Sequence, residues 1–221
     1  MKGLPDSLKN IYTKVGDIML ITKIEPQKNP DRVNVYIDGK FAFGILKEIQ
    51  LKYSLDENME IDKDFIKDVL LEEEKLKAKN KALRFLSYQR RSTKEVKDKL
   101  EREGFETFII EETIAYLKSY NLLDDLEYAK AFMEAKARQN KYGPERIKFE
   151  LYKKGIPREI IDKVLEEYPD EYSIAYNLAL KKKKTYKTND RRVLYGKLGN
   201  FLQQKGFTYD CILRVLEDIL E

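Results

Sequence analysis

The first part of the chain alternates hydrophobic and polar positions, which is the pattern of β-strands. RVNVYID, residues 32–38, has the period of a half-buried strand. Its apolar positions are Val33, Val35 and Ile37. Asp38-Gly39 then matches a two-residue hairpin turn, because both turn positions need positive φ. With strands at residues 19–25 and 41–45, the pattern predicts a small three-stranded antiparallel meander.

The predicted meander has one apolar face, and three strands need a partner to cover such a face. The last strand, FAFGI, is expected to send three side chains to that side: Phe41, Phe43 and Ile45. KEIQLKYSL, residues 47–55, begins a short helix in this interpretation. We therefore expect a small β-plus-helix domain at the start of the chain.

After the predicted sheet, apolar positions recur every three or four residues, the period of a helix. Residues 62–88 contain no glycine or proline and predict one long helix, or two with a break in the charged middle. A new helix begins at Ser92, since Ser92 and Glu95 have the S-x-x-E spacing of a capping box. At the position 51 residues later, Gly143 is followed by Pro144, and proline is favoured at the first helical position.

The helical part of the chain repeats itself at an interval of 51 residues. The phrases KLEREGFETFII, ELYKKGIPREII and FLQQKGFTYDCI align in register at four positions, which argues for one structural unit used three times. Their glycines are Gly104, Gly155 and Gly206. Each glycine is expected to end a helix in a left-handed conformation, with the leucine four residues earlier touching the apolar residue that follows, as in a Schellman motif.

The repeated phrase is thus predicted to lie between the second and third helices of a three-helix unit. The fold class is mostly α, a tandem array of three three-helix repeats of period 51 behind the small β domain. The first helices of the repeats are expected at residues 76–89, 125–140 and 171–187. The predicted divisions are an N-terminal extension at 1–18, expected to be poorly ordered, the β domain at 19–73, and repeats at 74–124, 125–171 and 172–221. Such arrays bury one unit against the next and present an extended surface.

Composition excludes several classes of protein. The chain has 221 residues, 42% of them hydrophobic and 37% charged, enough for one large core or two modest ones. No apolar run approaches the roughly 20 residues of a membrane span, and the first residues lack the apolar segment of a secretory signal. The one cysteine, Cys211, cannot form an intrachain disulfide, which fits a reducing compartment such as the cytoplasm. We expect Cys211 to be a small buried hydrophobic residue.

The net charge of +4 is unevenly distributed. Residues 1–73 carry a net charge of −3 and residues 74–221 a net charge of +7. A basic excess suits a polyanion or an acidic protein surface, but it also suits an ordinary solvated helical protein. Charge by itself leaves both interpretations open.

The order and spacing of several motifs resemble the RecX regulatory protein family. ALRFLSYQRRSTKEVKDKLEREGF is similar to its A-x-x-x-L-S and R-S-x-x-E-[LV]-x-x-x-L-x-x-[KE]-G patterns, and NLLDDLEYAKAF to its D-D-x-x-[YF]-A junction. The matching positions are Ala82, Leu86, Ser87, Arg91, Ser92, Glu95, Val96, Leu100, Gly104, Asp124, Asp125, Tyr128 and Ala129. KYGPERIKFELYKKGI supplies the second copy, and the third repeat is the loosest match. ITKIEPQ…VYIDGKFAFGI resembles the sheet-bearing extension of one branch, so the resemblance covers roughly residues 19–221.

The resemblance implies regulation without catalysis. RecX proteins bind the recombinase RecA on single-stranded DNA, lie in or cap the groove of its filament, and suppress filament growth, ATP hydrolysis and strand exchange. The implied partners are the RecA filament and single-stranded DNA, contacted directly or through RecA. The expected setting is DNA recombination, DNA repair and the SOS response in the cytoplasm. No membrane, small-molecule substrate or cofactor is expected.

The densest basic feature is a lysine run near the start of the third repeat. The candidate contact residues there are Lys181, Lys182, Lys183, Lys184, Tyr186, Lys187, Arg191 and Arg192. The cations could neutralise phosphates and the tyrosine could stack on a base. Alternatively, the run is a solvated helix end, where lysines favour the negative end of the helix dipole. The sequence leaves these two interpretations open.

Two further pairs of residues attract attention. Arg90 and Arg91 precede a helix N-terminus, where backbone N–H groups favour an anion and guanidinium groups add donors; bonds to the preceding helix's last carbonyls are the alternative. Asp124 and Asp125 suggest a metal or acid–base pair, but aspartate at a helix start is more simply an N-cap.

Enzyme interpretations find little support in the sequence. The chain has no histidine, which excludes histidine-based triads and the common zinc sites. The glycines of GKLGNF lack the spacing of a phosphate-binding loop. We therefore expect a protein that is not an enzyme: a RecA-filament modulator or, as alternatives, a general DNA-binding helical-repeat protein or a scaffold for protein interactions.

Overall fold

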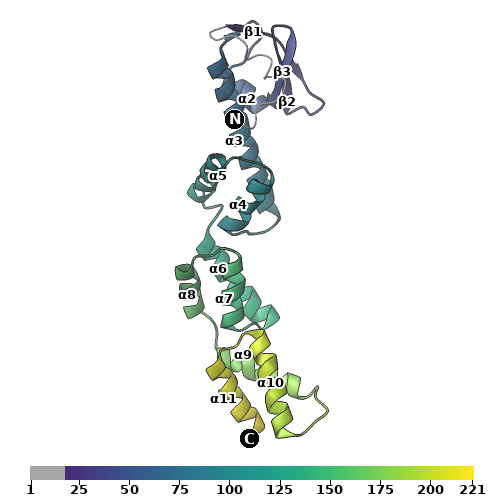
Figure 1. The fold of residues 1–221 in the computed structure, drawn as a ribbon, viewed down its shortest axis with the longest axis vertical. Coiled ribbons are helices and arrows are strands. Elements are labelled where there is room, and N and C mark those ends of the chain that lie inside the picture. Colours follow the sequence, from purple (N-terminus) through teal and green to yellow (C-terminus); the bar gives the residue numbers. More distant parts are fainter. Residues whose placement is uncertain (1–17) are drawn as a thin grey trace. The chain divides into compact units, whose positions relative to one another are not determined.

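The computed structural model describes residues 18–221 of the chain (Figure 1). The predicted N-terminal extension therefore lies outside the described residues, apart from Ile18. Contacts divide the chain into two compact units. The first extends to Lys81 and includes Phe105–Ile109, and the second holds Ala82–Gly104 and Ile110–Glu221.

The first unit contains an antiparallel four-stranded sheet with the order β3-β2-β1-β4. Its strands are β1 (Met19–Pro26), β2 (Arg32–Ile37), β3 (Lys40–Leu46) and β4 (Glu60–Ile61). The first three form the predicted meander, and the turn between β2 and β3 has positive φ at Asp38 (47°) and Gly39 (77°), as predicted. The sequence did not predict β4, because a strand of two residues is too short to show alternation.

The predicted apolar face of β3 is wrong at one position. Phe43 and Ile45 are buried, but Phe41 is 48% exposed and Ala42 is buried in its place. The pairing of β2 with β3 shifts register between Val35 and Tyr36, as in a β-bulge, so the alternation is broken there. Phe41 instead packs edge-on against Tyr36, with ring centroids 5.8 Å apart.

Two helices complete the core of the first unit. The predicted short helix is α2 (Lys47–Lys52), which buries Ile49, and the long helix α3 (Lys63–Tyr88) is continuous and contributes Ile66 and Val69. A buried carboxylate also holds α3 to the sheet: Glu73 accepts hydrogen bonds from Leu46 N at 2.8 Å and from Arg32 Nη1 at 3.0 Å. The sheet thus has the helical partner that a small meander needs.

The rest of the chain forms the predicted three-helix repeats. The helices after α3 are α4 (Thr93–Arg102), α5 (Thr107–Ser119), α6 (Asp125–Ala135), α7 (Pro144–Lys153), α8 (Arg158–Glu166), α9 (Glu171–Lys183), α10 (Arg191–Lys205) and α11 (Tyr209–Leu220), with a π-helix, η1 (Lys136–Asn140), after α6. Figure 1 shows α6, α7 and α8 grouped together, and α9, α10 and α11 likewise. Each group encloses its own hydrophobic cluster. The mostly helical fold with three repeats is confirmed, while the exact boundaries between repeats stay a prediction.

The repeated glycines have the predicted left-handed conformation, with φ of 89° at Gly104, 73° at Gly155 and 82° at Gly206. After α7, Gly155 N donates to Tyr152 O and Ile156 N donates to Leu151 O, which are the two bonds of a Schellman motif. The same two bonds recur after α10. The leucine of each phrase is fully buried: Leu100, Leu151 and Leu202.

The starts of the second helices also follow the sequence. Ser92 and Glu95 form both bonds of the capping box on α4, and Pro144 is the first residue of α7. The Asp190 side chain caps α10 by accepting hydrogen bonds from Arg192 N and Val193 N. Local side-chain chemistry therefore determines where these helices begin.

One of the predicted first helices changes its geometry, and another is shorter than expected. The helix expected at 125–140 changes from α to π geometry at Lys136 and ends before Lys141, which has a left-handed φ of 52°. The helix expected at 171–187 ends at Lys183. The lysine run therefore crosses the end of a helix. Within residues 18–221, no helix is both long enough and apolar enough to cross a membrane.

Candidate functional site at the repeat junctions

Neighbouring repeats of the second unit meet at two contacts of the same kind. In each, the start of one repeat's second helix lies against the end of the next repeat's second helix. We call the contact of α4 with the end of α7 the first junction, and the contact of α7 with the end of α10 the second junction. The 51-residue interval relates them, since Ser92 corresponds to Gly143 and Lys154 to Lys205.

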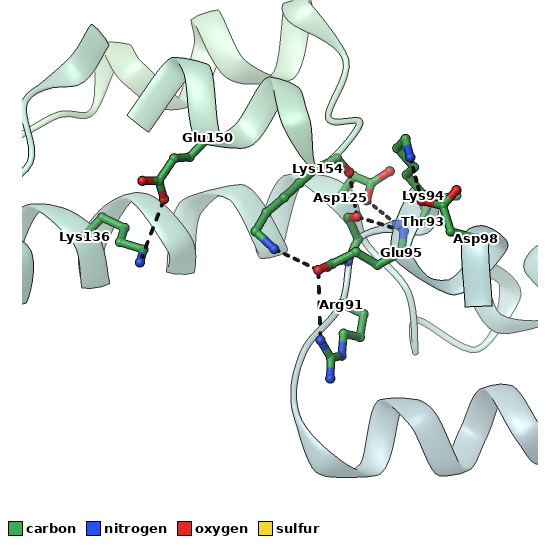
Figure 2. A network of polar contacts seen from close by, with 10 residues as sticks. Arg91, Thr93, Lys94, Glu95, Asp98, Asp125, Lys136, Glu150 and Lys154 are labelled. Atoms are coloured by element: carbon green, nitrogen blue, oxygen red, sulfur yellow. Dashed lines mark hydrogen bonds and ion pairs between the residues drawn. The ribbon is translucent and has the colours of Figure 1, made fainter. Parts of the chain in front are cut away.

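The first junction is a polar network between the first two repeats (Figure 2). Ser92 Oγ donates to Lys154 O at 2.7 Å, so the residue that caps α4 also satisfies a carbonyl at the end of α7. Lys154 Nζ donates to Glu95 Oε1 at 2.8 Å. Asp125 Oδ1 accepts a hydrogen bond from Thr93 N at 2.8 Å and thereby places a carboxylate at the start of α4.

The second junction is made mainly by backbone groups. Gly143 N donates to Lys205 O at 2.8 Å, and Glu145 N donates to Gly206 O at 3.0 Å. Arg146 Nη1 donates to Gln204 O at 2.9 Å. The same helix ends therefore meet in both junctions, through a side chain at Ser92 and through the main chain at Gly143.

These contacts explain a second requirement for glycine. A Cβ on Gly155 would lie 2.6 Å from Lys94 Cβ, and a Cβ on Gly206 would lie 2.4 Å from Arg146 N. For Gly104, by contrast, the described residues place no atom within 4 Å of an added Cβ. Gly104 is required only for the left-handed conformation of its turn. Gly155 and Gly206 have that conformation too, and they also allow the preceding repeat to approach closely.

Glu95 and Lys154 each shift the pKa of the other in the direction that favours its charged form. Burial by itself raises the pKa of the Glu95 carboxyl, but the hydrogen bonds from Lys154 and from Ser92 N, with the charges of Lys154 and Arg91, hold it below its ordinary value. Burial lowers the pKa of Lys154, and the hydrogen bonds with Glu95 and Tyr128 outweigh it and raise that pKa. Both groups are therefore charged at neutral pH, and the pair stabilises the first junction.

The lysine run does not form a single surface. Lys183 Nζ donates to Ile219 O at 2.7 Å, at the last turn of α11. Lys182 Nζ lies 5.5 Å from the ring centre of Tyr186 and 5.4 Å from that of Phe201. Tyr186 is half-buried against the core of the third repeat, with Lys182 and Lys197 near its ring. These three residues contribute to packing of the third repeat.

The other predicted residues of this region are accessible. Four are exposed on the turn after α9 and the start of α10: Lys184, Lys187, Arg191 and Arg192. Lys181 is exposed on the last turn of α9 and lines a cleft that also involves Lys141. The run thus divides into residues that pack within the third repeat and cations that are accessible to solvent, and contact of the accessible cations with phosphates stays a prediction.

Arg90 and Arg91 lie at a cleft of about 410 Å³ beside the first junction. Its other lining residues are Asn121, Leu122, Asp124, Glu127 and Tyr128. Arg90 is exposed, whereas the Arg91 guanidinium lies 4.3 Å from the ring centre of Phe85 and 4.0 Å from Glu95 Oε1. Arg91 therefore belongs to the junction, and Arg90 is the accessible member of the pair.

Asp124 has the N-cap role that its position predicts, and Asp125 has a structural role that the sequence did not predict. Asp124 caps α6 by accepting hydrogen bonds from Leu126 N and Glu127 N, and Asp125 bonds across the first junction. Within the described part of the chain, no group of three or more Cys, Asp or Glu side chains is placed to hold a metal ion. Cys211 is half-buried, and burial raises the pKa of its thiol to about 11.

Sequence reasoning missed a set of cations around Tyr142 at the second junction. The Arg146 guanidinium lies 4.0 Å from the centre of the Tyr142 ring, with Lys205 Nζ at 5.2 Å and Lys136 Nζ at 5.6 Å. These residues are scattered in the sequence and form no run. The 51-residue interval could have identified one of them, because Arg146 stands where the preceding repeat has the oppositely charged Glu95.

Comparison with known protein families assigns four successive segments of this chain. Residues 19–62 match the regulatory protein RecX N-terminal domain. Residues 78–117, 124–165 and 169–216 match the first, second and third RecX three-helix domains. The matched segments follow the order of the sheet and the three repeats.

Individual relatives agree. The chain is 43% identical to the regulatory protein RecX of Clostridioides difficile (strain 630) over 91% of this chain and 96% of that protein. It is 39% identical to the regulatory protein RecX of Clostridium perfringens (strain 13 / Type A) over 86% of this chain and 92% of that protein. A crystal structure of regulatory protein RecX superposes with a TM-score of 0.71 at 28% identity over 90% of this chain and 99% of that one. The crystal structure of RecX from Lactobacillus salivarius superposes with a TM-score of 0.62 at 33% identity over 66% of this chain and 96% of that one. This chain belongs to the RecX family of regulatory proteins.

Proposed function

We propose that this protein binds RecA filaments on single-stranded DNA and inhibits ATP hydrolysis, filament extension and strand exchange by RecA. Membership of the RecX family carries the proposal, because the matched segments extend from residue 19 to residue 216. The family implies regulation of RecA, and the inhibition is our inference for this chain. The proposed mode of action is binding, with no chemical step on a substrate.

The architecture supports a binding role in physical terms. Polar bonds at both junctions and glycines that permit close approach hold the repeats of the second unit at defined positions. Repeats that contact their neighbours present side chains from several units to one partner. Such a surface can recognise a partner that is itself a repeating assembly.

We propose that the accessible basic side chains make part of this contact. They are Arg90, Lys181, Lys184, Lys187, Arg191 and Arg192. We expect less from Arg91, Lys182, Lys183 and Tyr186, since these side chains already pack within the repeats. Exposed cations contribute mainly to long-range attraction, so their effect should weaken as salt increases.

The test is the ATPase activity of RecA on single-stranded DNA in the presence of increasing amounts of this protein. We expect activity to fall as the protein is added. The Lys184→Glu/Lys187→Glu variant should inhibit less, by roughly tenfold in the concentration required, with a smaller difference at high salt.

The matched control is Lys28→Glu/Lys40→Glu, which makes the same change of net charge at two exposed lysines of the first unit. An equal loss in this variant would assign the effect to total charge and remove Lys184 and Lys187 from the contact. Undiminished RecA ATPase at a large excess of the unmodified protein would refute the proposed function.

A further inference from the structure

An apolar groove of about 470 Å³ lies between α10 and α11, which pack side by side in the third repeat (Figure 1). Tyr195, Gly196 and Gly199 of α10 line one wall, and Tyr209 and Leu213 of α11 line the other. A Cβ added to Gly196 would meet no described atom within 4 Å, so the α10 wall is low where a side chain is missing. The groove therefore has room for apolar side chains of another chain.

The charge of this groove does not suit a nucleic acid. Glu145, the second residue of α7, is the one charged side chain among the lining residues that the structure describes. On α10, Lys197 Nζ lies 5.4 Å from the centre of the Tyr186 ring, and on α11 the Arg214 guanidinium lies 4.4 Å from that of Tyr172. Neither tyrosine lines the groove. Since a carboxylate repels phosphates and attracts a cation, the groove suits an apolar protein segment that carries a positive charge.

The outer face of α7 continues this surface. Glu145, Phe149 and Tyr152 are spaced i, i+4 and i+7, so their side chains lie on one side of the helix. Phe149 is 56% exposed and Tyr152 is 71% exposed. Lys153 Nζ lies 4.3 Å from the centre of the Phe149 ring, which places a cation beside these rings. The second unit thus presents two projecting rings with a cation next to a hollow with a carboxylate.

These two features complement each other in shape and in charge. The rings of Phe149 and Tyr152 match a groove whose walls are apolar and low, and the Lys153 cation matches the Glu145 carboxylate. Within one chain Lys153 is held away from Glu145, because the part of α7 between them is about 12 Å long. A second copy of the chain carries the same rings and cation and is free to present them to the groove.

We propose that this protein self-associates through this surface. Phe149 and Tyr152 of one copy lie in the α10–α11 groove of another, and Lys153 of the first copy faces Glu145 of the second. Burial of the rings supplies the main stabilisation, and the charged pair fixes the orientation of the two copies. The association goes beyond the proposed regulation of RecA and requires neither RecA nor DNA.

The first test is sedimentation velocity of the full chain without RecA or DNA, at concentrations from about 1 to 200 µM. We expect the weight-average mass to rise above that of one chain as the concentration increases. Tyr152→Ser removes a projecting ring and should raise the dissociation constant by roughly tenfold. Tyr88→Ser is the matched control, since Tyr88 is 72% exposed and lies in the first repeat. Its dissociation constant should stay within about twofold of that of the unmodified protein.

A second variant changes the groove itself. Gly196→Lys fills the hollow and places a cation opposite Lys153 of the other copy, so the dissociation constant should rise by roughly tenfold or more. The fold should persist, because the added side chain has open space and lysine is a better helix former than glycine. Circular dichroism checks this. An effect of Tyr88→Ser equal to that of Tyr152→Ser, or unchanged association in both Tyr152→Ser and Gly196→Lys, would overturn the proposal.

Exchange of the charges tests the pairing of the two copies. Glu145→Lys and Lys153→Glu should each raise the dissociation constant by roughly fivefold at low salt, because each brings like charges together. The double variant restores an opposite pair and should return to within about twofold of the unmodified protein. A double variant as weak as the single variants would reject the contact between Lys153 and Glu145.

The same variants identify any other occupant of the groove. A protein that stays monomeric at about 200 µM would overturn self-association. If Gly196→Lys then inhibits the RecA ATPase less well than the unmodified protein, the groove belongs to the contact with RecA and not to a second copy. Inhibition by the unmodified protein is measured separately, so failure of self-association leaves the proposed regulation standing, and failure of inhibition rejects the regulation alone.

Discussion

At the scale of single residues, the three repeated glycines look alike in sequence but have different surroundings. All three have left-handed φ, which costs any other L-residue roughly 1 kcal/mol. Only Gly155 and Gly206 also face a neighbouring repeat at a distance too short for a Cβ. The conformational requirement is therefore common to all, and the steric requirement belongs to two.

This difference predicts unequal effects of alanine at Gly104 and Gly206. Gly104→Ala should lower the free energy of unfolding by about 1 kcal/mol, the cost of the left-handed conformation alone. Gly206→Ala should cost at least about 2 kcal/mol, because its methyl group would lie 2.4 Å from the backbone nitrogen of Arg146. Urea unfolding followed by circular dichroism measures both. Equal losses would show that the close approach at the second junction contributes no additional energy.

At the scale of elements, one residue can serve two helices. Ser92 caps α4 through its own capping box, and its hydroxyl donates to the carbonyl of Lys154 at the end of α7. The side chain is completely buried. The start of one helix and its contact with the next repeat are therefore established together by a hydroxyl group.

Ser92→Ala should consequently cost more than the loss of an ordinary cap. Loss of the cap costs about 1 kcal/mol, and a buried Lys154 carbonyl left without its donor adds about 1–3 kcal/mol. The unfolding midpoint in urea should fall accordingly. Ser87→Ala is the control, since Ser87 is exposed and its hydroxyl bonds only within its own helix, to Arg84 O. If the two variants lose equal stability, Ser92 does not hold the junction.

At the scale of the whole molecule, charge at the first junction makes stability depend on pH. The pKa of the Glu95 carboxyl in the folded protein lies below its ordinary value of 4.5. A group of this kind stabilises the fold at pH values above its unfolded pKa, and the stabilisation is lost as the pH falls through the folded pKa. The pair therefore contributes at neutral pH and fades under acidic conditions.

Glu95→Gln tests this dependence. Near neutral pH the variant should be less stable by about 1 kcal/mol, a modest value because both partners are partly solvated. The difference from the unmodified protein should shrink as the pH falls below 4.5. Unfolding free energies at several pH values give the comparison. A difference that stays constant into acid would assign the loss to packing and not to the charge of Glu95.

Much of the fold could be predicted because its causes are local. The hairpin at Asp38-Gly39, the capping box at Ser92 and the glycine-terminated helices depend on residues close together in the chain. The two-residue strand β4 and the exposed position of Phe41 could not be predicted, since both depend on pairing between strands. The candidate site divides in the same way, because the lysine run was visible in sequence but the packing of Lys182 and Lys183 was not.

The sequence by itself determined the fold class, the three-helix repeat, its interval of 51 residues and the family, because periodicity and motif spacing record local conformation and order along the chain. Only the tertiary structure decided which equivalent residues face one another. The interval relates Glu95 to Arg146 and Lys154 to Lys205, but not either lysine to its neighbour across a junction. That pairing depends on how closely one repeat packs against the next, which no single repeat specifies by its own sequence.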